Sequence, residues 1–245
     1  MQVVTCHAGK LQTLTAKLSR LGSRRSREHA FATDLPAFDA LAPGQSLARG
    51  AVHELLHDPH HAAPSFVAAL LARSSAATAR AVVWSDPHGT LYPPALAALG
   101  VDLDRLYVLR PRSPADEAWA VTECLRCRGV GAVIAAPPRV SRVEARRFQL
   151  AAEQGGTVGV LVRPLTRGSD IYAAATRWLV APARGERTVQ RWSVQLVHGH
   201  GGRVGEVVFL EWCRETHSVR AVEKLADRPA ATTATPQQQQ RRATA

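Results

Sequence analysis

The stretch that decides the fold is LARGAVHELLHDPHHAAPS, residues 47–65. Within it, residues 52–56 have the composition of a strand, and a connection rich in proline and histidine leads into a helical pattern over residues 65–78. A strand followed directly by a helix is the first half of a strand–helix–strand unit. The sequence therefore predicts that a parallel sheet begins here.

The alternation of strand and helix continues well beyond this stretch. Apolar runs predict strands at 81–85, 106–109, 132–135 and 158–162, and helical patterns fall between them at 93–99, 113–128 and 141–154. Strands that are apolar along their whole length are buried on both faces, so this pattern indicates a mostly parallel sheet flanked by helices.

The pattern changes in the last part of the core, where strands follow one another without helices. They are predicted at 177–181, 188–198 and 204–212, and the last two flank the glycine-rich residues 199–203. A short glycine-rich connection between two strands is typical of a hairpin. The predicted fold class is therefore α/β, with a C-terminal antiparallel hairpin added to the parallel sheet.

The two ends of the chain differ from the core in composition. In residues 1–30, a basic linker follows an amphipathic helix with one apolar face, formed by Leu11, Leu14, Leu18 and Leu21. This face either packs on its own domain or docks another subunit, and the spacing does not distinguish the two. Residues 31–213 are the predicted core domain. Residues 214–245 are a C-terminal extension that turns to proline, alanine, threonine and glutamine from about Asp227, and we expect it to be largely disordered.

The charge of the chain points to anionic partners. Lysine and arginine number 31 against 20 acidic residues, a formal net charge of +11. Such a chain attracts polyanions, although a coding bias toward arginine produces the same excess. Four cysteines are too few for a disulfide framework, and no apolar run is long enough to span a bilayer. We expect a cytoplasmic, nucleoid-associated protein with no membrane partner.

Several segments of the core resemble known proteins. The segments LPAFDAL (35–41), LARGAVHEL (47–55) and LGVDLDRL (99–106) resemble the RecA-type recombinase core. The segments VLRPRSPAD (108–116) and FQLAAE (148–153) resemble the ImuA family, which comprises RecA-like accessory proteins of bacterial translesion synthesis. The resemblance covers roughly residues 31–212 and implies a RecA-like core.

The resemblance also locates the phosphate site of the nucleotide-hydrolysing relatives, in the connection after the first core strand. Such a site needs glycines that bring backbone amides to the phosphates, then a lysine and a hydroxyl residue. Here the connection has no glycine, and the lysine and hydroxyl positions fall on Ala63 and Pro64. We interpret His57, Asp58, Ala63 and Pro64 as a degenerate phosphate loop. We therefore expect no catalytic residue, no metal site and no cofactor.

Two other places favour a non-catalytic interpretation. The strand at 132–135 runs into Ala136 and Pro137, where an ATPase of this class carries the acid that holds the magnesium shell. The final hairpin carries His198 and His200, where relatives present permanent cations to a neighbour's nucleotide. We expect these histidines and the leucine face to contact partners.

The resemblance implies four partners: an ImuB-type homologue of the Y-family polymerases, an error-prone replicative-type DNA polymerase, RecA and DNA. RecA relatives place DNA-facing loops after two of their core strands, and the candidates for phosphate contact there are Arg139, Arg142, Arg163 and Arg167. A solvated helix face is the alternative interpretation of this basic character.

Three other functions are open. An ATPase with an unorthodox phosphate site would use Asp86 or His88, in the segment after the strand at 81–85. The motif HELLH, residues 53–57, matches the zinc-peptidase pattern, although that chemistry needs a helix and the context predicts a strand. A division inhibitor of the SulA kind is a third alternative, which binding to the division GTPase would test.

Overall fold

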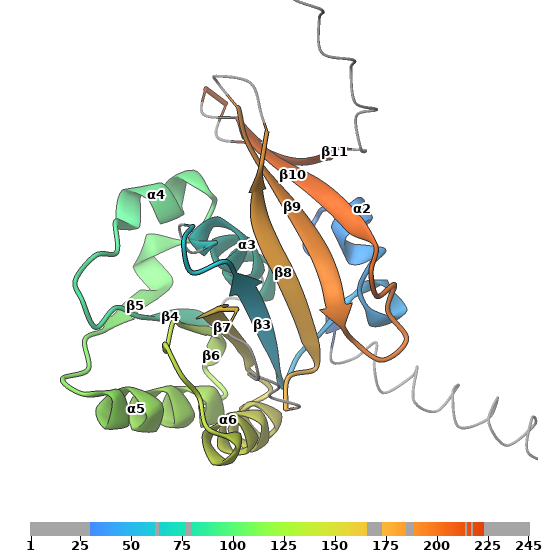
Figure 1. The fold of residues 1–245 in the computed structure, drawn as a ribbon. Helices are drawn as coiled ribbons and strands as arrows, with labels where there is room; N and C mark the ends of the chain where they lie inside the picture. Colours follow the sequence, from blue (N-terminus) through green and yellow to red (C-terminus); the bar gives the residue numbers. More distant parts are fainter. Residues whose placement is uncertain are drawn as a thin grey trace, which may run out of the picture.

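The computed structural model describes residues 30–61, 64–76, 80–165, 173–184, 189–213, 215–216 and 218–222 (Figure 1). The predicted N-terminal helix lies outside these residues, together with its leucines Leu11, Leu14, Leu18 and Leu21. The glutamine-rich end of the chain lies outside them too. No helix in the described ranges is long and apolar enough to cross a bilayer.

A nine-stranded sheet forms the centre of the described part of the chain, in the order β11-β10-β9-β8-β3-β7-β6-β4-β5. Six adjacent strands run parallel: β3 (Ala51–His57), β4 (Ala81–Ser85), β5 (Leu106–Leu109), β6 (Val130–Ala135), β7 (Val158–Pro164) and β8 (Thr176–Ala183). Three antiparallel strands extend the sheet beyond β8: β9 (Val189–His198), β10 (Val207–Cys213) and β11 (Ser218–Val222). Separately, β1 (Ala30–Phe31) pairs with β2 (Leu47–Ala48).

Helices cover both faces of the sheet (Figure 1). Helix α3 (Ser65–Ala76) packs on one face, and α5 (Pro114–Arg126) and α6 (Arg142–Gly155) pack side by side on the other. The shorter elements are α2 (Pro36–Asp39), α4 (Pro93–Ala98) and the 3-10 turns η1 (Pro43–Gln45) and η2 (Leu103–Arg105). Two layers of helix explain why β6, inside the sheet, is apolar and buried along its whole length.

The two long helices on one face begin at side-chain caps that the sequence encodes. The Ser113 hydroxyl accepts a hydrogen bond from the Asp116 amide at 3.1 Å, which caps α5. Ser141 and Glu144 form a reciprocal capping box at the start of α6, and Gly156 ends the helix in the left-handed conformation, with φ of 63°. These caps fix where both helices start relative to the end of β6.

Aromatic stacking joins the antiparallel strands to the parallel core. Trp178 on β8 is completely buried and stacks on Phe38 of α2 with ring centroids 4.5 Å apart. Phe66 of α3 stacks in the same way on Trp192 of β9, also at 4.5 Å. Stacked rings of this kind add to the free energy gained from apolar burial. The antiparallel strands therefore belong to the same core as the parallel strands.

The structure confirms the predicted α/β class, with a mostly parallel sheet flanked by helices and antiparallel strands at its C-terminal end. It differs from the prediction at β11, because residues 218–222 fall in the segment that we expected to be largely disordered. Trp119 also differs from the other four tryptophans, since its side chain is 67% exposed on α5.

At Gly155, the end of α6 lies very close to the end of α5, and a substitution there tests this packing. A Cβ atom at this position would lie 2.1 Å from the carbonyl oxygen of Leu125. Because backbone atoms cannot move aside cheaply, Gly155→Ala is expected to lower the free energy of unfolding by about 2 kcal/mol or more. Gly129→Ala is the matched control, since its Cβ would meet only the Cys127 sulfur at 3.8 Å. Equal losses for the two variants in urea unfolding would contradict this packing.

Candidate functional site

The connection that leaves the carboxyl end of β3 is a turn organised by its own polar groups. The Asp58 carboxylate accepts a hydrogen bond from the His60 amide at 2.8 Å, and His57 Nδ1 lies 2.9 Å from the Asp58 carbonyl oxygen. His61 Nδ1 lies 4.0 Å from the same carboxylate. The turn therefore presents a carboxylate where a phosphate-binding loop presents amide hydrogens.

The start of α3 lacks one amide donor beside this turn. Pro64 is buried and has no amide hydrogen, and its carbonyl accepts from the amides of Val67 and Ala68 at 3.0 and 3.2 Å. Ala63, the other residue assigned to the degenerate loop, lies outside the described residues. Since there is no glycine and no lysine between His57 and Ser65, these residues do not fit the phosphates of a nucleoside triphosphate.

Neighbouring strand ends do not supply a magnesium site. Strand β6 ends in the buried Ala135, and the chain continues through the exposed Ala136 to Pro137 without a carboxylate. Across the described residues, no group of three or more histidine, cysteine, aspartate or glutamate side chains is close enough to hold a metal ion. The end of β6 therefore lacks the acid that holds the magnesium shell in ATPases of this class.

Asp86 is a buried acid that directly follows β4. Its carboxylate accepts hydrogen bonds from the amides of Thr90 at 2.9 Å and Leu91 at 3.2 Å. Burial alone would raise the pKa of Asp86, but these hydrogen bonds outweigh burial and hold the pKa below its ordinary value. The acid therefore holds the turn after β4, while His88 in that turn is exposed.

The HELLH motif lies on strand β3, which contradicts the zinc-peptidase alternative. His53 is completely buried, with Nδ1 2.7 Å from the Thr176 hydroxyl and Nε2 2.9 Å from the Ala48 carbonyl oxygen. Successive side chains of a strand point to opposite faces, so Glu54 points away from His53. His57, four residues along an extended strand, is too far from His53 to share one zinc ion with it.

Glu54 is the centre of a buried ion-pair network. Its two carboxylate oxygens accept hydrogen bonds from Arg163 on β7 at 2.9 Å and from Arg177 on β8 at 2.8 Å. Arg163 is only 3% exposed. The expectation that Arg163 contacts DNA was therefore wrong, because its guanidinium is buried in the sheet and neutralises Glu54. No local pattern indicates this pairing, because it joins strands more than a hundred residues apart in the chain.

Comparisons with known proteins support both the fold and the family. No model of a protein family matches the chain. Two proteins named ImuA, from two strains of Caulobacter vibrioides, are each 32% identical to it over 218 residues, covering 78% of this chain and 88% of the relative. This chain belongs to the ImuA family.

Two further likenesses of this ImuA-family protein are more distant. The crystal structure of the RadB recombinase superposes with a TM-score of 0.61 at 11% identity, covering 78% of this chain and 99% of RadB. This likeness shows that the fold is RecA-like. A cell division inhibitor, SulA of Photorhabdus laumondii, is 28% identical over 107 residues, which cover 44% of this chain and 60% of SulA.

The remaining arginine candidates of the ImuA-family chain divide between exposed and undescribed positions. Arg139 and Arg142 are exposed at the entrance to α6, and Arg146 and Arg147 are exposed one turn further along the helix. Arg167 lies outside the described residues. The exposed arginines remain available to an anionic partner.

The final hairpin presents one of its two candidate histidines to solvent. His200 is exposed and His198 is half-buried, with their rings edge to face and centroids 5.4 Å apart. The turn itself is held against the body, because the Arg203 amide donates to the Leu41 carbonyl oxygen at 2.9 Å and a Cβ at Gly202 would lie 2.9 Å from that oxygen. Contact of the histidines with a partner stays a prediction.

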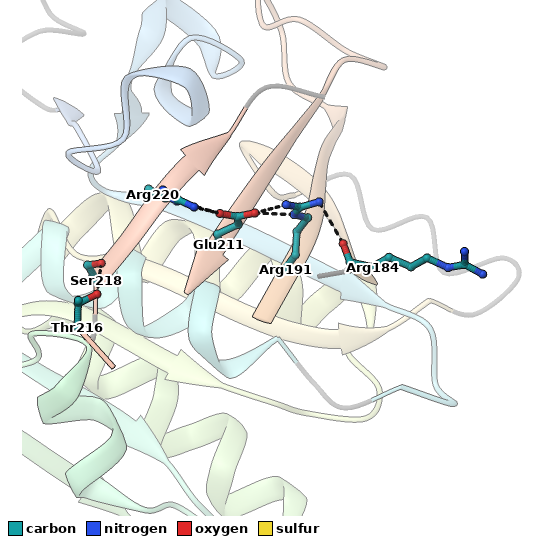
Figure 2. A network of polar contacts seen from close by, with 6 residues as sticks. All are labelled: Arg184, Arg191, Glu211, Thr216, Ser218 and Arg220. Atoms are coloured by element: carbon teal, nitrogen blue, oxygen red, sulfur yellow. Dashed lines mark hydrogen bonds and ion pairs between the residues drawn. The ribbon is translucent and has the colours of Figure 1, made fainter. Parts of the chain in front are cut away.

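A second ion-pair network, which sequence reasoning missed, crosses the antiparallel strands (Figure 2). Glu211 on β10 accepts hydrogen bonds from Arg191 on β9 and from Arg220 on β11, each through a guanidinium Nε at 2.8 Å. Arg191 also donates to the Arg184 carbonyl oxygen at 3.1 Å. Burial alone would raise the pKa of Glu211, but the two arginines hold it below its ordinary value. The network ties β11 to the sheet.

The two classes of arginine are distinguished by stability measurements. Arg163→Ala leaves Glu54 with one of its two cations removed, so the free energy of unfolding is expected to fall by about 3–5 kcal/mol. Arg139→Ala removes an exposed side chain and is expected to change it by about 0.5 kcal/mol or less. Urea unfolding of both variants measures the difference. Equal tolerance of the two substitutions would contradict the buried pairing of Arg163.

His53 makes stability depend on pH. Burial lowers the pKa of His53 from 6.5 to about 4, so the unfolded chain binds a proton that the folded protein excludes. Stability is therefore complete above pH 6.5 and falls as the pH decreases from 6.5 toward 4, by a loss on the order of 2–3 kcal/mol. Urea unfolding across this range should show the loss in the wild type.

His53→Gln removes the titrating group and is expected to flatten the pH dependence of stability. His88→Gln, at an exposed histidine, is the matched control and should retain the wild-type dependence. A wild-type protein whose stability does not change across this range, or a His53→Gln variant that keeps the full dependence, would show that His53 is not the cause.

Proposed function

We propose that this ImuA-family chain is a non-catalytic, RecA-like accessory protein of translesion DNA synthesis and damage-induced mutagenesis. It bridges an ImuB-type homologue of the Y-family polymerases and an error-prone replicative-type DNA polymerase, and it also meets RecA and DNA. Family membership and the RecA-like fold support an association with the response to DNA damage. The bridging role and the named partners are what the proposal adds.

One observation supports the non-catalytic part of this proposal: the connection after β3 lacks the groups that hold phosphates in nucleotide-hydrolysing relatives. Asp58 points a carboxylate at its own turn, Pro64 contributes no amide, the connection contains no lysine, and β6 ends without an acid. Each loss removes a different component of nucleotide chemistry: the amide cradle, the cation and the magnesium ligand. A body that keeps the fold while losing all three components serves as a scaffold.

The surfaces proposed for partners are the leucine face of residues 11–21 and the C-terminal hairpin with His200. An apolar helix face with no acid around it suits a groove on another protein. The exposed arginines at the start of α6 suit the phosphates of DNA, with an affinity that falls as salt rises.

Capture from DNA-damaged cells tests the bridging role. The tagged full-length chain is expected to recover the ImuB-type protein and the error-prone polymerase, identified by mass spectrometry. Recovery should be unchanged when ATP is depleted from the lysate, because the proposal assigns the nucleotide no part. Recovery of neither polymerase-related protein, or recovery that requires ATP, would contradict the proposal.

Substitutions in the N-terminal segment separate docking from self-packing. Leu14→Asp with Leu18→Asp places two charges on the leucine face and is expected to reduce capture at least about tenfold, the loss of a single buried anchor contact. Gln12→Asp with Ala16→Asp adds the same charge at the same spacing on the other side of the predicted helix and should leave capture unchanged. Equal effects of the two pairs would show that charge, and not the apolar face, determines binding.

The likeness to SulA supports a second candidate, a cell division inhibitor. The match extends over less than half of this chain, so it supports this function less than the ImuA relatives support the first. The same capture experiment separates the two candidates, since a division inhibitor should recover the division GTPase in place of the polymerases.

A further inference from the structure

An apolar cavity lies between α5 and α6, beside the carboxyl end of β6. Its volume is about 280 Å³. The apolar lining comes from Ala118 and Val121 of α5, Pro137, Pro138 and Val140 of the connection after β6, and Phe148 of α6. A cavity of this size is smaller than the sites that enclose whole small molecules, and it suits one bulky apolar side chain.

Two chain segments beside this cavity are rich in arginine. Residues 110–117 and 137–147, which include part of the lining, contain six arginines and three carboxylates. The arginines are all exposed: Arg110, Arg112, Arg139, Arg142, Arg146 and Arg147. Arg139 lines the cavity directly. The net positive charge of these segments favours an anionic partner.

Two of the three carboxylates are already engaged within the chain. Glu117 is buried and accepts a hydrogen bond from the Ser85 hydroxyl at 2.6 Å. Glu144 accepts from the Ser141 amide and hydroxyl at 2.7 and 2.6 Å, and these bonds lower the pKa of its carboxyl. Asp116 is the third, at the exposed first turn of α5. With six arginines against three carboxylates, these two segments carry a formal net charge of +3.

We propose that this cavity binds an acidic peptide segment of a protein partner, with one bulky apolar side chain of the peptide inserted between α5 and α6. The apolar lining provides the anchor contact, and the arginines contact carboxylates on either side of that anchor. The site rests on the partner-binding part of the proposed function, and it assigns that role to residues other than the four leucines and the hairpin histidines.

The lining favours a peptide over a nucleic acid. A nucleobase binds by stacking on an exposed ring or by hydrogen bonds to its edge. Phe148 is only 3% exposed and offers no ring face, and the polar side chains at the cavity other than Arg139 are the carboxylates of Glu117 and Glu144. Phosphates alone would contact the arginines without using the cavity.

Methyl NMR of the full-length chain tests the site directly. The probe is a synthetic peptide with one central phenylalanine flanked on both sides by aspartate and glutamate. Its addition should shift the methyl resonances of Val121 and Val140 in a saturable way. The same peptide with alanine in place of phenylalanine is expected to bind at least about tenfold more weakly, because it lacks the apolar anchor.

Charge-reversal pairs provide matched controls. Arg139→Glu with Arg142→Glu should weaken peptide binding at least about tenfold. Arg126→Glu with Arg128→Glu reverses two exposed charges at the opposite end of α5 and should leave binding unchanged. Ala118→Trp fills the cavity and should abolish binding. Unshifted methyl resonances of Leu55 and Leu70, in the core on the α3 face of the sheet, would show that the fold is intact.

Several results would overturn the site. Resonances of the Val121 and Val140 methyls that do not shift would do so, as would an alanine peptide that binds as tightly as the phenylalanine peptide. A loss of binding in Arg126→Glu with Arg128→Glu equal to that in the Arg139 and Arg142 pair would also do so. The same methyl shifts with an oligothymidylate would assign the cavity to nucleic acid. Capture of the polymerase partners together with unmoved methyls would overturn the cavity and leave the bridging proposal intact. Peptide binding without capture of those partners would support the cavity and contradict the bridging proposal.

Discussion

The ion pairs of Glu54 connect three neighbouring strands in the middle of the sheet. Its carboxylate sits on β3 between Arg163 of β7 and Arg177 of β8, and therefore joins the parallel strands on both sides of β3. Strand β8 is also the last parallel strand before the antiparallel group begins. Because a buried charge without its partner is costly, the three residues are needed together. The residues of β3 that look most reactive in the sequence are thus used to maintain the sheet.

Successive side chains of β3 point to opposite faces of the sheet, which explains the different environment of the neighbouring His53. It lies on the opposite face of β3, is held by Thr176 and Ala48, and stays neutral because it is buried. The carboxyl edge of the sheet is left with the turn at Asp58, the exposed segment after β6 and a group of arginines at the start of α6. That combination suits contact with anionic macromolecules better than nucleotide chemistry.

Local patterns in the sequence were enough to predict most of the architecture. The strands β3 to β10 and the helices α3 to α6 follow from apolar periodicity and turn residues, which act within a few positions of one another. The degenerate phosphate connection could also be predicted, since it depends on which residue types are present. The strand conformation of the HELLH motif could be predicted from its flanking residues, and the structure then excludes the zinc-peptidase alternative.

Features that depend on distant partners could not be predicted. The burial of Arg163 requires knowing that β7 lies beside β3, and an arginine after a strand otherwise looks like a surface residue. Strand β11 is short and alternates polar with apolar residues, and it is fixed by Arg220 pairing with Glu211 across β10 (Figure 2). The cavity between α5 and α6 is formed by segments that only the fold brings together.

We propose that this ImuA-family chain keeps a RecA-like fold in which the former phosphate site no longer binds ATP. Isothermal titration calorimetry of the purified wild-type chain with Mg²⁺-ATP tests this claim most directly. The account predicts no saturable heat up to about 1 mM nucleotide. One-to-one binding with a Kd of about 10 µM or lower would contradict it.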